Sequence, residues 1–197
     1  MKMKVAVLQT KVFADKNENL EQVKALMARE DVAACDLVTL PEMWNCPYQT
    51  ENFPIYAERE DSEFVRALAE LAKKHHVYFQ AGSIPEVDEA GHVYNTAYTF
   101  DREGKCIDKY RKVHLFDIFV KGGQVFKESD TLTAGDGFRV FDTEFGKMGV
   151  NICFDIRFPE SARIPTLHGA RILMNPGAFN MTTGPAHWEL AFRQRAV

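Results

Sequence analysis

The 197-residue chain lacks several features that would place it in a special class of protein. No apolar run approaches the roughly 18 residues that a membrane-spanning helix needs, and the early run from Val5 to Leu8 is too short for the core of a signal peptide. Neither sign of charge dominates, since 24 basic and 28 acidic residues leave a net charge of −4, which argues against a nucleic-acid-binding surface. We therefore expect a cytoplasmic protein that binds neither membranes nor nucleic acids.

Cysteine is also scarce, and its spacing excludes two common uses. Cys35, Cys46, Cys106 and Cys153 lie far apart, without a C-x-x-C pair or a histidine at zinc-finger spacing. A disulfide framework and a structural zinc site are both disfavoured for this reason. What the chain does have is globular composition, with 46% apolar and 26% charged residues. Repeats, linkers and low-complexity tracts are absent from the sequence, so we predict one domain over residues 1–197.

The order of the expected strands and helices is typical of an α/β protein. Residues 95–101 and 105–110 flank Arg102-Glu103-Gly104, a pattern that predicts an antiparallel hairpin. Gly82 is expected to end the strand before this hairpin. The order predicts a mixed α/β sheet whose faces are covered by helices. Apolar runs predict the other strands and helical spacing predicts the helices: strands over residues 4–9, 36–40, 77–81, 147–152 and 171–175, and helices over residues 17–29, 62–75, from 159 and over 187–197.

Cys153 closes the predicted strand over residues 147–152, at the kind of sheet edge where open α/β proteins bind ligands. A cation or a helix N-terminus beside the thiol would lower its pKa and populate the nucleophilic thiolate. The alternative is an inert buried cysteine, because free cysteine is among the most buried residue types. We keep that interpretation for Cys35, Cys46 and Cys106.

Two charged residues occupy comparable positions. Glu42 follows the predicted strand over residues 36–40 and lies beside Met43 and Trp44. A carboxylate desolvated by such neighbours suits a general base that works near neutrality, whereas a surface glutamate is the plain alternative. Lys112 is flanked by apolar and aromatic residues, where an ammonium group could stabilise an oxyanion. A solvated basic strand would explain the same pattern.

Three segments around these residues resemble, in order and in spacing, the catalytic motifs of the nitrilase superfamily of carbon–nitrogen hydrolases. They are LPEMWNCPY around Glu42, KYRKVHLFD around Lys112 and GVNICFDIRFPE around Cys153. The later segment NPGAFNMTTGPAHWELAFRQRAV is similar to the omega-amidase branch, which hydrolyses the terminal amide of 2-oxoglutaramate and 2-oxosuccinamate. The resemblance spans the whole chain. It implies a four-layer αββα sandwich of the nitrilase type, with a Glu-Lys-Cys triad between the two sheets.

The resemblance also implies a role for each matching residue. Cys153 would be the nucleophile, Glu42 the general base and Lys112 the oxyanion partner, helped by the backbone N–H of Phe154. Glu128 matches the family's second glutamate, which helps to hold the lysine and the substrate amide. The thiolate would attack the amide carbon, ammonia would leave, and water would hydrolyse the thioester. The partners of this reaction are a small amide and water, and no metal or organic cofactor is implied.

The same resemblance extends to recognition of a substrate carboxylate. In the omega-amidase branch an arginine and a threonine bind the substrate carboxylate, and the matching residues here are Arg157 and Thr183. The guanidinium group of an arginine can bind a carboxylate bidentately. A structural ion pair from Arg157 to Asp155 or Glu160 is the alternative. Tyr48 is expected to form a wall of the pocket, or else to be an aromatic residue that only packs.

Two other enzyme classes find partial support in the sequence. A papain-like pair would need His114, His168 or His187 beside Cys153, but no peptidase motif surrounds the cysteine. His114 and Asp117 are too few to form a metal site without further ligands. Neither class is favoured over the amidase.

The C-terminal end departs from the family pattern. Members of the superfamily continue through further strands and a helical tail, whereas the predicted helix over residues 187–197 reaches the end of the sequence without a capping residue. We expect an incomplete sandwich with an uncovered sheet edge, and a homo-oligomer as the result. Two functions compete: an amidase whose C-terminal part is missing, and a catalytically silent module that acts through association with itself or with another chain.

Overall fold

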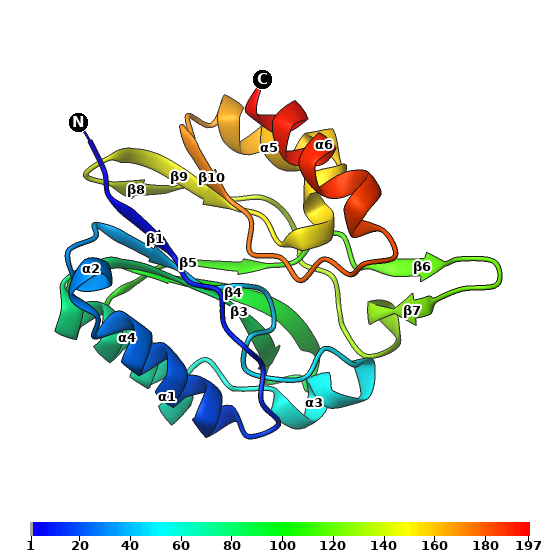
Figure 1. The fold of residues 1–197 in the computed structure, drawn as a ribbon, viewed down its shortest axis with the longest axis horizontal. Helices are drawn as coiled ribbons and strands as arrows, with labels where there is room; N and C mark the ends of the chain where they lie inside the picture. The colour runs from blue at the N-terminus through cyan, green and yellow to red at the C-terminus, as the bar shows by residue number, and fades with distance from the viewer. Residues whose placement is uncertain (1) are drawn as a thin grey trace.

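The structure, a computed structural model, describes residues 2–197 and contains two stacked β-sheets (Figure 1). Strands β1, β2 and β3 of the larger sheet run parallel, and β3, β4 and β5 run antiparallel. This arrangement confirms the expected mixed sheet, including the hairpin of β4 and β5. In spatial order the larger sheet consists of β1 (Val5–Val7), β2 (Leu37–Thr39), β3 (Tyr78–Val87), β4 (Val93–Phe100) and β5 (Cys106–Arg111).

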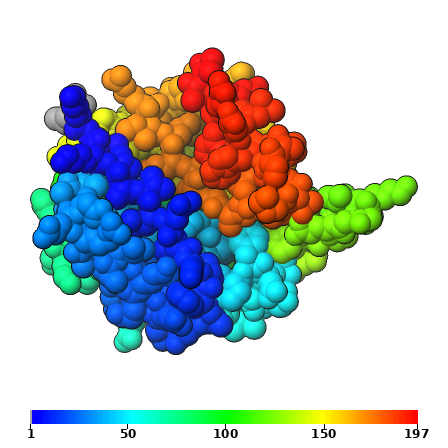
Figure 2. Space-filling view, viewed as in Figure 1, coloured from blue at the N-terminus to red at the C-terminus, as the bar shows by residue number. Residues whose placement is uncertain are grey.

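The smaller sheet consists of β10 (Ile172–Met174), β9 (Gly146–Val150) and β8 (Phe141–Thr143), in that spatial order. Strand β10 runs parallel to β9, and β8 runs antiparallel to it. A separate ribbon of β6 (Asp117–Phe119) and β7 (Val125–Lys127) projects from the body of the molecule (Figures 1 and 2). The sequence analysis predicted neither β8 nor this ribbon.

Helices cover the outer faces of both sheets (Figure 1). On the larger sheet these are α1 (Lys16–Met27), α2 (Glu30–Ala33) and α4 (Glu63–His75), and on the smaller sheet they are α5 (Pro159–Leu167) and α6 (Gly184–Ala196). Among residues 2–197, none of the helices has the length and apolar character needed to cross a membrane. The connections contain α3 (Phe53–Tyr56) and the 3₁₀ helices η1 (Thr50–Asn52), η2 (Glu128–Asp130) and η3 (Cys153–Arg157).

Two clusters of buried hydrophobic side chains fill the space between neighbouring layers. The first lies between the helices and the larger sheet and contains Val23 of α1, Leu68 of α4 and Phe79 of β3. The second lies between the two sheets, where Tyr110 of β5 packs in one cluster with Val150 of β9. The layers therefore run helix, sheet, sheet, helix. This is the four-layer αββα sandwich of the nitrilase type that the sequence analysis expected.

Gly82 does not end the third strand, contrary to the expectation from the sequence. The pairing of β3 with β4 shifts register between Gln80 and Ser83, and Gly82 has a φ angle of 62° at this bulge. A β-carbon at Gly82 would lie 2.1 Å from the carbonyl oxygen of Pro41, so only glycine fits. The bulge lets β3 approach the segment that leads to Glu42, and β3 then continues to its end.

Arg102, in the turn between β4 and β5, joins three other parts of the molecule. Its guanidinium group donates hydrogen bonds to Asp36 Oδ1 at 3.0 Å, Glu144 Oε1 at 2.7 Å and the carbonyl oxygen of His76 at 2.7 Å. The Arg102 side chain is only 18% exposed, so water screens these contacts weakly. One side chain thus ties the hairpin to the segment before β2, to the end of α4 and to the turn between β8 and β9.

We expect Arg102→Met to lower the free energy of unfolding by about 2 kcal/mol, because several hydrogen bonds to charged acceptors are lost together. Urea denaturation followed by circular dichroism measures the change. Arg139→Met is the matched control, since Arg139 is 57% exposed and forms an ion pair with the exposed Asp136. Equal losses in the two variants would contradict the role assigned to Arg102.

Candidate active site

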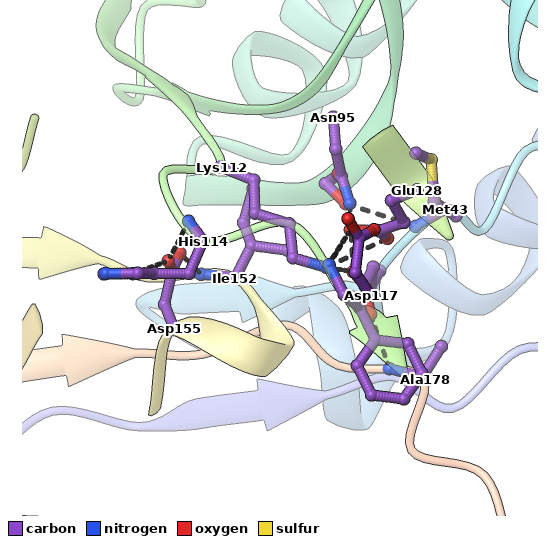
Figure 3. Close-up of polar contacts among 12 residues, drawn as sticks. Met43, Asn95, Lys112, His114, Asp117, Glu128, Ile152, Asp155 and Ala178 are labelled. Atoms are coloured by element: carbon purple, nitrogen blue, oxygen red, sulfur yellow. Dashed lines mark hydrogen bonds and ion pairs between the residues drawn. The ribbon is translucent and has the colours of Figure 1, made fainter. Parts of the chain in front are cut away.

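Three segments that are distant in the sequence place charged side chains in one cluster (Figure 3). Glu42 lies shortly after β2, Lys112 directly after β5, and Glu128 at the start of η2. All three are buried, with exposed fractions of 2%, 0% and 0%. The alternatives of a surface glutamate and of a solvated basic strand are therefore wrong.

The ammonium group of Lys112 lies between the two carboxylates. Its Nζ atom is 2.8 Å from Glu42 Oε1 and 2.9 Å from Glu128 Oε2. Burial alone would lower the pKa of Lys112, but the charges of Glu128 and Glu42 outweigh it and hold the pKa above its ordinary value. The lysine consequently stays cationic near neutrality, where it can stabilise negative charge that develops beside it.

The Glu42 carboxylate is fixed by donors that the sequence analysis missed. The side-chain amide of Asn95 donates to Glu42 Oε1 at 2.9 Å, and the backbone N–H of Ala178 donates to Glu42 Oε2 at 2.9 Å (Figure 3). Glu128 is held in the same way by the backbone N–H of Phe116, at 2.7 Å from Oε2. The only sequence signal for Asn95 was its position at the start of the predicted strand over residues 95–101, and backbone donors have no signal in the sequence.

Tyr48 combines the two interpretations that the sequence left open. Its ring stacks on Phe126 and meets Phe53 edge-on, each with a centroid distance of 5.5 Å. Its hydroxyl group donates to Glu128 Oε1 at 2.5 Å and lies 3.3 Å from Glu42 Oε1. Burial and the two carboxylates raise the pKa of Tyr48 well above its ordinary value, so the hydroxyl remains a donor.

Cys153 opens η3 with a strained backbone, since its φ angle of 44° lies in the left-handed region that residues other than glycine avoid. The backbone N–H of Cys153 donates to the carbonyl oxygen of Pro176 at 2.8 Å. Burial and then the nearby Glu42 carboxylate raise the pKa of the thiol well above its ordinary value, although Lys112 acts in the opposite direction. The expected lowering of this pKa is therefore wrong, and the thiol needs a base to give up its proton.

A narrow pocket has Cys153 in its wall. The larger groove around Glu86, Lys109 and Arg111 lies elsewhere, and its charged side chains pair with one another. Beside Cys153 the pocket is lined by aromatic residues, by small ones and by three polar residues that face the same space: Tyr48, Phe116, Phe154, Ala178 and Phe179, with Arg157, Asn180 and Thr183.

Arg157 brings a cation into this pocket without a carboxylate partner. Its guanidinium carbon lies 5.1 Å from the ring centroid of Phe154 and 5.9 Å from that of Phe179. Within residues 2–197 it forms no ion pair with Asp155 or Glu160, and its buried Nε has no hydrogen-bond partner. Burial accordingly lowers the pKa of Arg157. The alternative of a structural ion pair is wrong.

Thr183 and Asn180 form the polar side of the pocket opposite the aromatic rings. The Thr183 hydroxyl donates to Asn180 Oδ1 at 3.2 Å, and the backbone N–H of Thr183 donates to the same oxygen at 3.0 Å. The amide group of Asn180 also donates to Gln124 Oε1 at 3.0 Å, which links the pocket to the ribbon of β6 and β7. Asn180 was not singled out from the sequence.

The histidines do not form a catalytic pair with the cysteine. His114 Nδ1 contacts Asp155 Oδ1 at 2.8 Å, and its ring stacks on Phe158 at 3.6 Å. His168 and His187 are exposed. In the part of the chain that the structure describes, no group of three or more His, Cys, Asp or Glu side chains is arranged to hold a metal ion. The geometry thus supports neither a papain-like peptidase nor a metal centre.

The αββα sandwich places Cys153 in the wall of a pocket and Glu42, Lys112 and Glu128 in one buried cluster, an arrangement that differs from the Cys-His pair of papain-like proteases. Comparison with known proteins gives the family. Residues 4–197 match the family model described as carbon-nitrogen hydrolase. The chain belongs to this family.

Two curated relatives illustrate the similarity. The protein named omega-amidase NIT2 of Mus musculus is 46% identical over 194 residues, which are 98% of this chain and 70% of the mouse protein. Nitrilase homolog 2 of Dictyostelium discoideum is 47% identical over 195 residues, again 98% of this chain but 60% of the relative. The chain thus spans less than two thirds of the Dictyostelium protein and slightly more than two thirds of the mouse protein.

Solved structures agree with the fold. Nit3 of Saccharomyces cerevisiae, described as a member of branch 10 of the nitrilase superfamily, superposes with a TM-score of 0.86 at 40% identity, over 99% of this chain and 71% of Nit3. A carbon-nitrogen hydrolase from Helicobacter pylori superposes with a TM-score of 0.88 at 28% identity, over 99% of this chain and 70% of that protein. Both superpositions cover nearly all of the sandwich described above.

Proposed function

We propose that the chain is an amidase of the omega-amidase type, which releases ammonia from the terminal amide of a small dicarboxylic acid monoamide such as 2-oxoglutaramate. The observation that carries this proposal is the unpaired guanidinium group of Arg157 in the same narrow pocket as Cys153. A substrate with an amide at one end and a carboxylate at the other fits two such groups. The similarity to the mouse protein named omega-amidase supports the same substrate class.

In the proposed first half-reaction Glu42 accepts the thiol proton as the sulfur of Cys153 attacks the amide carbon. The former carbonyl oxygen becomes an oxyanion and receives hydrogen bonds from Lys112 Nζ and the backbone N–H of Phe154. Phe154 is the second residue of η3, where N–H groups have no partner within the helix. Glu42 then protonates the amide nitrogen, the C–N bond breaks, and ammonia leaves a thioester on Cys153.

In the second half-reaction Glu42 accepts a proton from water, whose oxygen attacks the thioester carbon. The C–S bond breaks, the carboxylic acid leaves, and the proton returns from Glu42 to the sulfur of Cys153. Throughout both halves Lys112 keeps its charge, because Glu128 and Glu42 hold its pKa high. Glu128 and Tyr48 keep the lysine and the base in place through the hydrogen bonds described above. These steps use no metal or organic cofactor.

The distal carboxylate of the substrate would bind to Arg157 and to the hydroxyl group of Thr183, which would turn its proton from Asn180 Oδ1 to the carboxylate while the Thr183 N–H still donates to Asn180. The guanidinium group of the half-buried Arg157 lies over the rings of Phe154 and Phe179. A carboxylate in that position compensates this cation, and a substrate without one leaves the cation unpaired. Discrimination between dicarboxylic monoamides and simple amides follows from this difference.

We expect Arg157→Met to raise KM for succinamate about 100-fold while leaving KM for propionamide nearly unchanged, because only the first substrate has a carboxylate for the guanidinium group. An ammonia-release assay with both substrates measures the two constants. Arg163→Met, at an exposed position on α5, is the matched control and should alter neither. Equal losses on both substrates would argue against a carboxylate clamp.

We also propose that the protein acts in the cytoplasm as a homo-oligomer, without nucleic-acid or membrane partners. Exposed apolar side chains support self-association: Val7 on the edge strand β1 is 73% exposed, Met181 is 85% exposed and Leu190 is 66% exposed. The same side chains favour the second candidate function, a catalytically silent module that acts by association. Ammonia release from 2-oxoglutaramate by the purified chain distinguishes the two, since a silent module releases none.

A further inference from the structure

Asp155 lies two residues after Cys153 and is fully buried, yet it is absent from the wall of the pocket. Its carboxylate accepts four hydrogen bonds. Oδ1 accepts from the backbone N–H of His114 at 2.9 Å and from His114 Nδ1 at 2.8 Å, while Oδ2 accepts from the Tyr110 hydroxyl at 2.6 Å and the backbone N–H of Ile152 at 2.9 Å. Both oxygens are therefore fully used, and none of this carboxylate remains for a substrate.

Asp155 and the residues that donate to it lie close in sequence to the two proposed reacting residues, Lys112 and Cys153. Tyr110 and His114 stand two residues before and two residues after Lys112, while Ile152 and Asp155 enclose Cys153. Lys112 follows a strand of the larger sheet, whereas Cys153 follows a strand of the smaller sheet. Figure 3 shows Asp155 between the segments of His114 and Ile152, beside Lys112. One carboxylate thus joins the segments that carry the lysine and the cysteine across the space between the sheets.

The backbone at Cys153 needs such a contact. A residue with a side chain persists at a φ angle of 44° only where its surroundings hold it there. The bond from Ile152 N–H to Asp155 Oδ2 fixes the peptide that precedes Ile152, and the bond from Cys153 N–H to the Pro176 carbonyl oxygen fixes the peptide that joins Ile152 to Cys153. The aromatic rings of His114 and Phe158 stack at 3.6 Å and keep the His114 side of the contact rigid.

We propose that Asp155 is a positioning residue that fixes the sulfur of Cys153 relative to the ammonium group of Lys112. It acts through Tyr110, His114 and Ile152 and touches no substrate atom. The consequence for turnover rests on the amidase function proposed above. The consequence for the thiol itself does not, because the surroundings of the sulfur depend on the same contact whether or not an amide is hydrolysed.

Asp155→Asn removes the contact with little change in volume. An asparagine places its NH₂ group where one carboxylate oxygen accepted hydrogen bonds. The bonds to at least one of the two oxygens, from His114 or from Tyr110 and Ile152, are therefore lost. Since a displacement of about 1 Å between reacting groups costs on the order of 100-fold in rate, we expect kcat for succinamate to fall about 100-fold. KM should change little, because Arg157 and Thr183 keep their places.

Asp108→Asn is the matched control. Asp108 lies on β5 two residues before Tyr110, is 8% exposed, and has an Oδ2 atom without a hydrogen-bond partner. Burial raises the pKa of Asp108 to about 6, so asparagine resembles its protonated form. We expect kcat and KM of this variant to match those of the unsubstituted chain. Tyr110→Phe is a second variant and removes one hydrogen-bond donor to Asp155. Its control is Tyr98→Phe, which removes a buried hydroxyl group that has no hydrogen-bond partner.

The rate at which iodoacetamide alkylates Cys153, measured from pH 6 to pH 10 with peptide mapping, reports on the thiol without any turnover. Asp155→Asn should alkylate faster at neutral pH, with the midpoint of the profile shifted towards that of a free thiol, because the loosened turn admits water to the sulfur. Asp108→Asn should keep the original profile. An unsubstituted chain that releases no ammonia defeats the proposed function only, since the alkylation profiles still test the position of the thiol.

Circular dichroism and thermal unfolding identify variants that remain folded. Should Asp155→Asn fail to fold, Tyr110→Phe decides the question, with an expected fall in kcat of about tenfold at unchanged KM and a smaller shift of the alkylation profile in the same direction. Folded Asp155→Asn or Tyr110→Phe with the kcat and alkylation profile of its control would overturn the proposal.

Discussion

Replacing Cys153 by alanine is expected to abolish ammonia release, to below about 1 part in 10,000 of the unsubstituted rate, because the nucleophile that forms the thioester is lost. The fold should remain, since the side chain contributes one sulfur atom to the cluster between the sheets. Ammonia release from succinamate and the circular dichroism spectrum measure the two outcomes. Retained turnover in this variant would exclude the thioester route.

Cys106→Ala is the control for this variant. Cys106 is exposed at the start of β5, and burial raises the pKa of the Cys46 thiol to about 12, so the Cys46 thiol is not a thiolate near neutrality. Neither residue lines the pocket around Cys153. The Cys106→Ala variant should therefore keep its full rate. A loss of turnover there would mean that the thiols act together.

Replacing Lys112 by methionine is expected to lower the free energy of unfolding by about 4 kcal/mol and to eliminate turnover. The methionine fills much of the same volume, but the carboxylates of Glu42 and Glu128 then face each other in a buried site without a cation. Removing one partner of a buried ion pair typically costs 3–5 kcal/mol, of which a large part is the uncompensated charge that remains. Urea denaturation of the folded variant measures the loss.

Lys109→Met is the control, because it removes a nearby lysine, on β5, that is not part of the buried cluster. Lys109 is 26% exposed and pairs with Glu86 and Glu60, but Glu86 keeps two hydrogen bonds from Arg111 after the change. We expect a loss of about 1 kcal/mol or less for this partly exposed pair, and unchanged turnover. Similar losses in the two variants would show that the buried cluster has no special dependence on its cation.

Strong local signals made parts of the fold predictable from the sequence. The helix expected over residues 62–75 is α4, whose N-terminus is capped by Ser62 through a hydrogen bond from the backbone N–H of Val65, and the expected turn around Gly104 joins β4 to β5. Strands β6, β7 and β8 have three residues each, and they exist because a partner strand pairs with them. Strands β1, β2 and β10 are as short, but they contain no charged residue and stand out as apolar runs, whereas β6, β7 and β8 contain Asp117, Lys127 and Asp142 and show no such pattern.

The candidate site shows a similar division. Glu42, Lys112 and Cys153 stood at predicted strand ends, and motif resemblance singled them out from other charged residues and thiols. Asn95 and Ala178 contact Glu42 from 53 and 136 positions away, and separations of this size have no local signature. The direction of the thiol pKa was wrong because burial, which only the folded chain creates, outweighs the cation beside it.

The main-chain donors to the two glutamates affect how substitutions can alter the site. The Oε2 atom of Glu42 is held by the peptide N–H of Ala178, and the Oε2 atom of Glu128 by that of Phe116. Every amino acid except proline supplies this N–H, so side-chain changes at positions 116 and 178 leave both bonds available. The chain can therefore vary the lining of its pocket at these two positions, and with it the choice of substrate, while the orientation of both carboxylates is inherited unchanged.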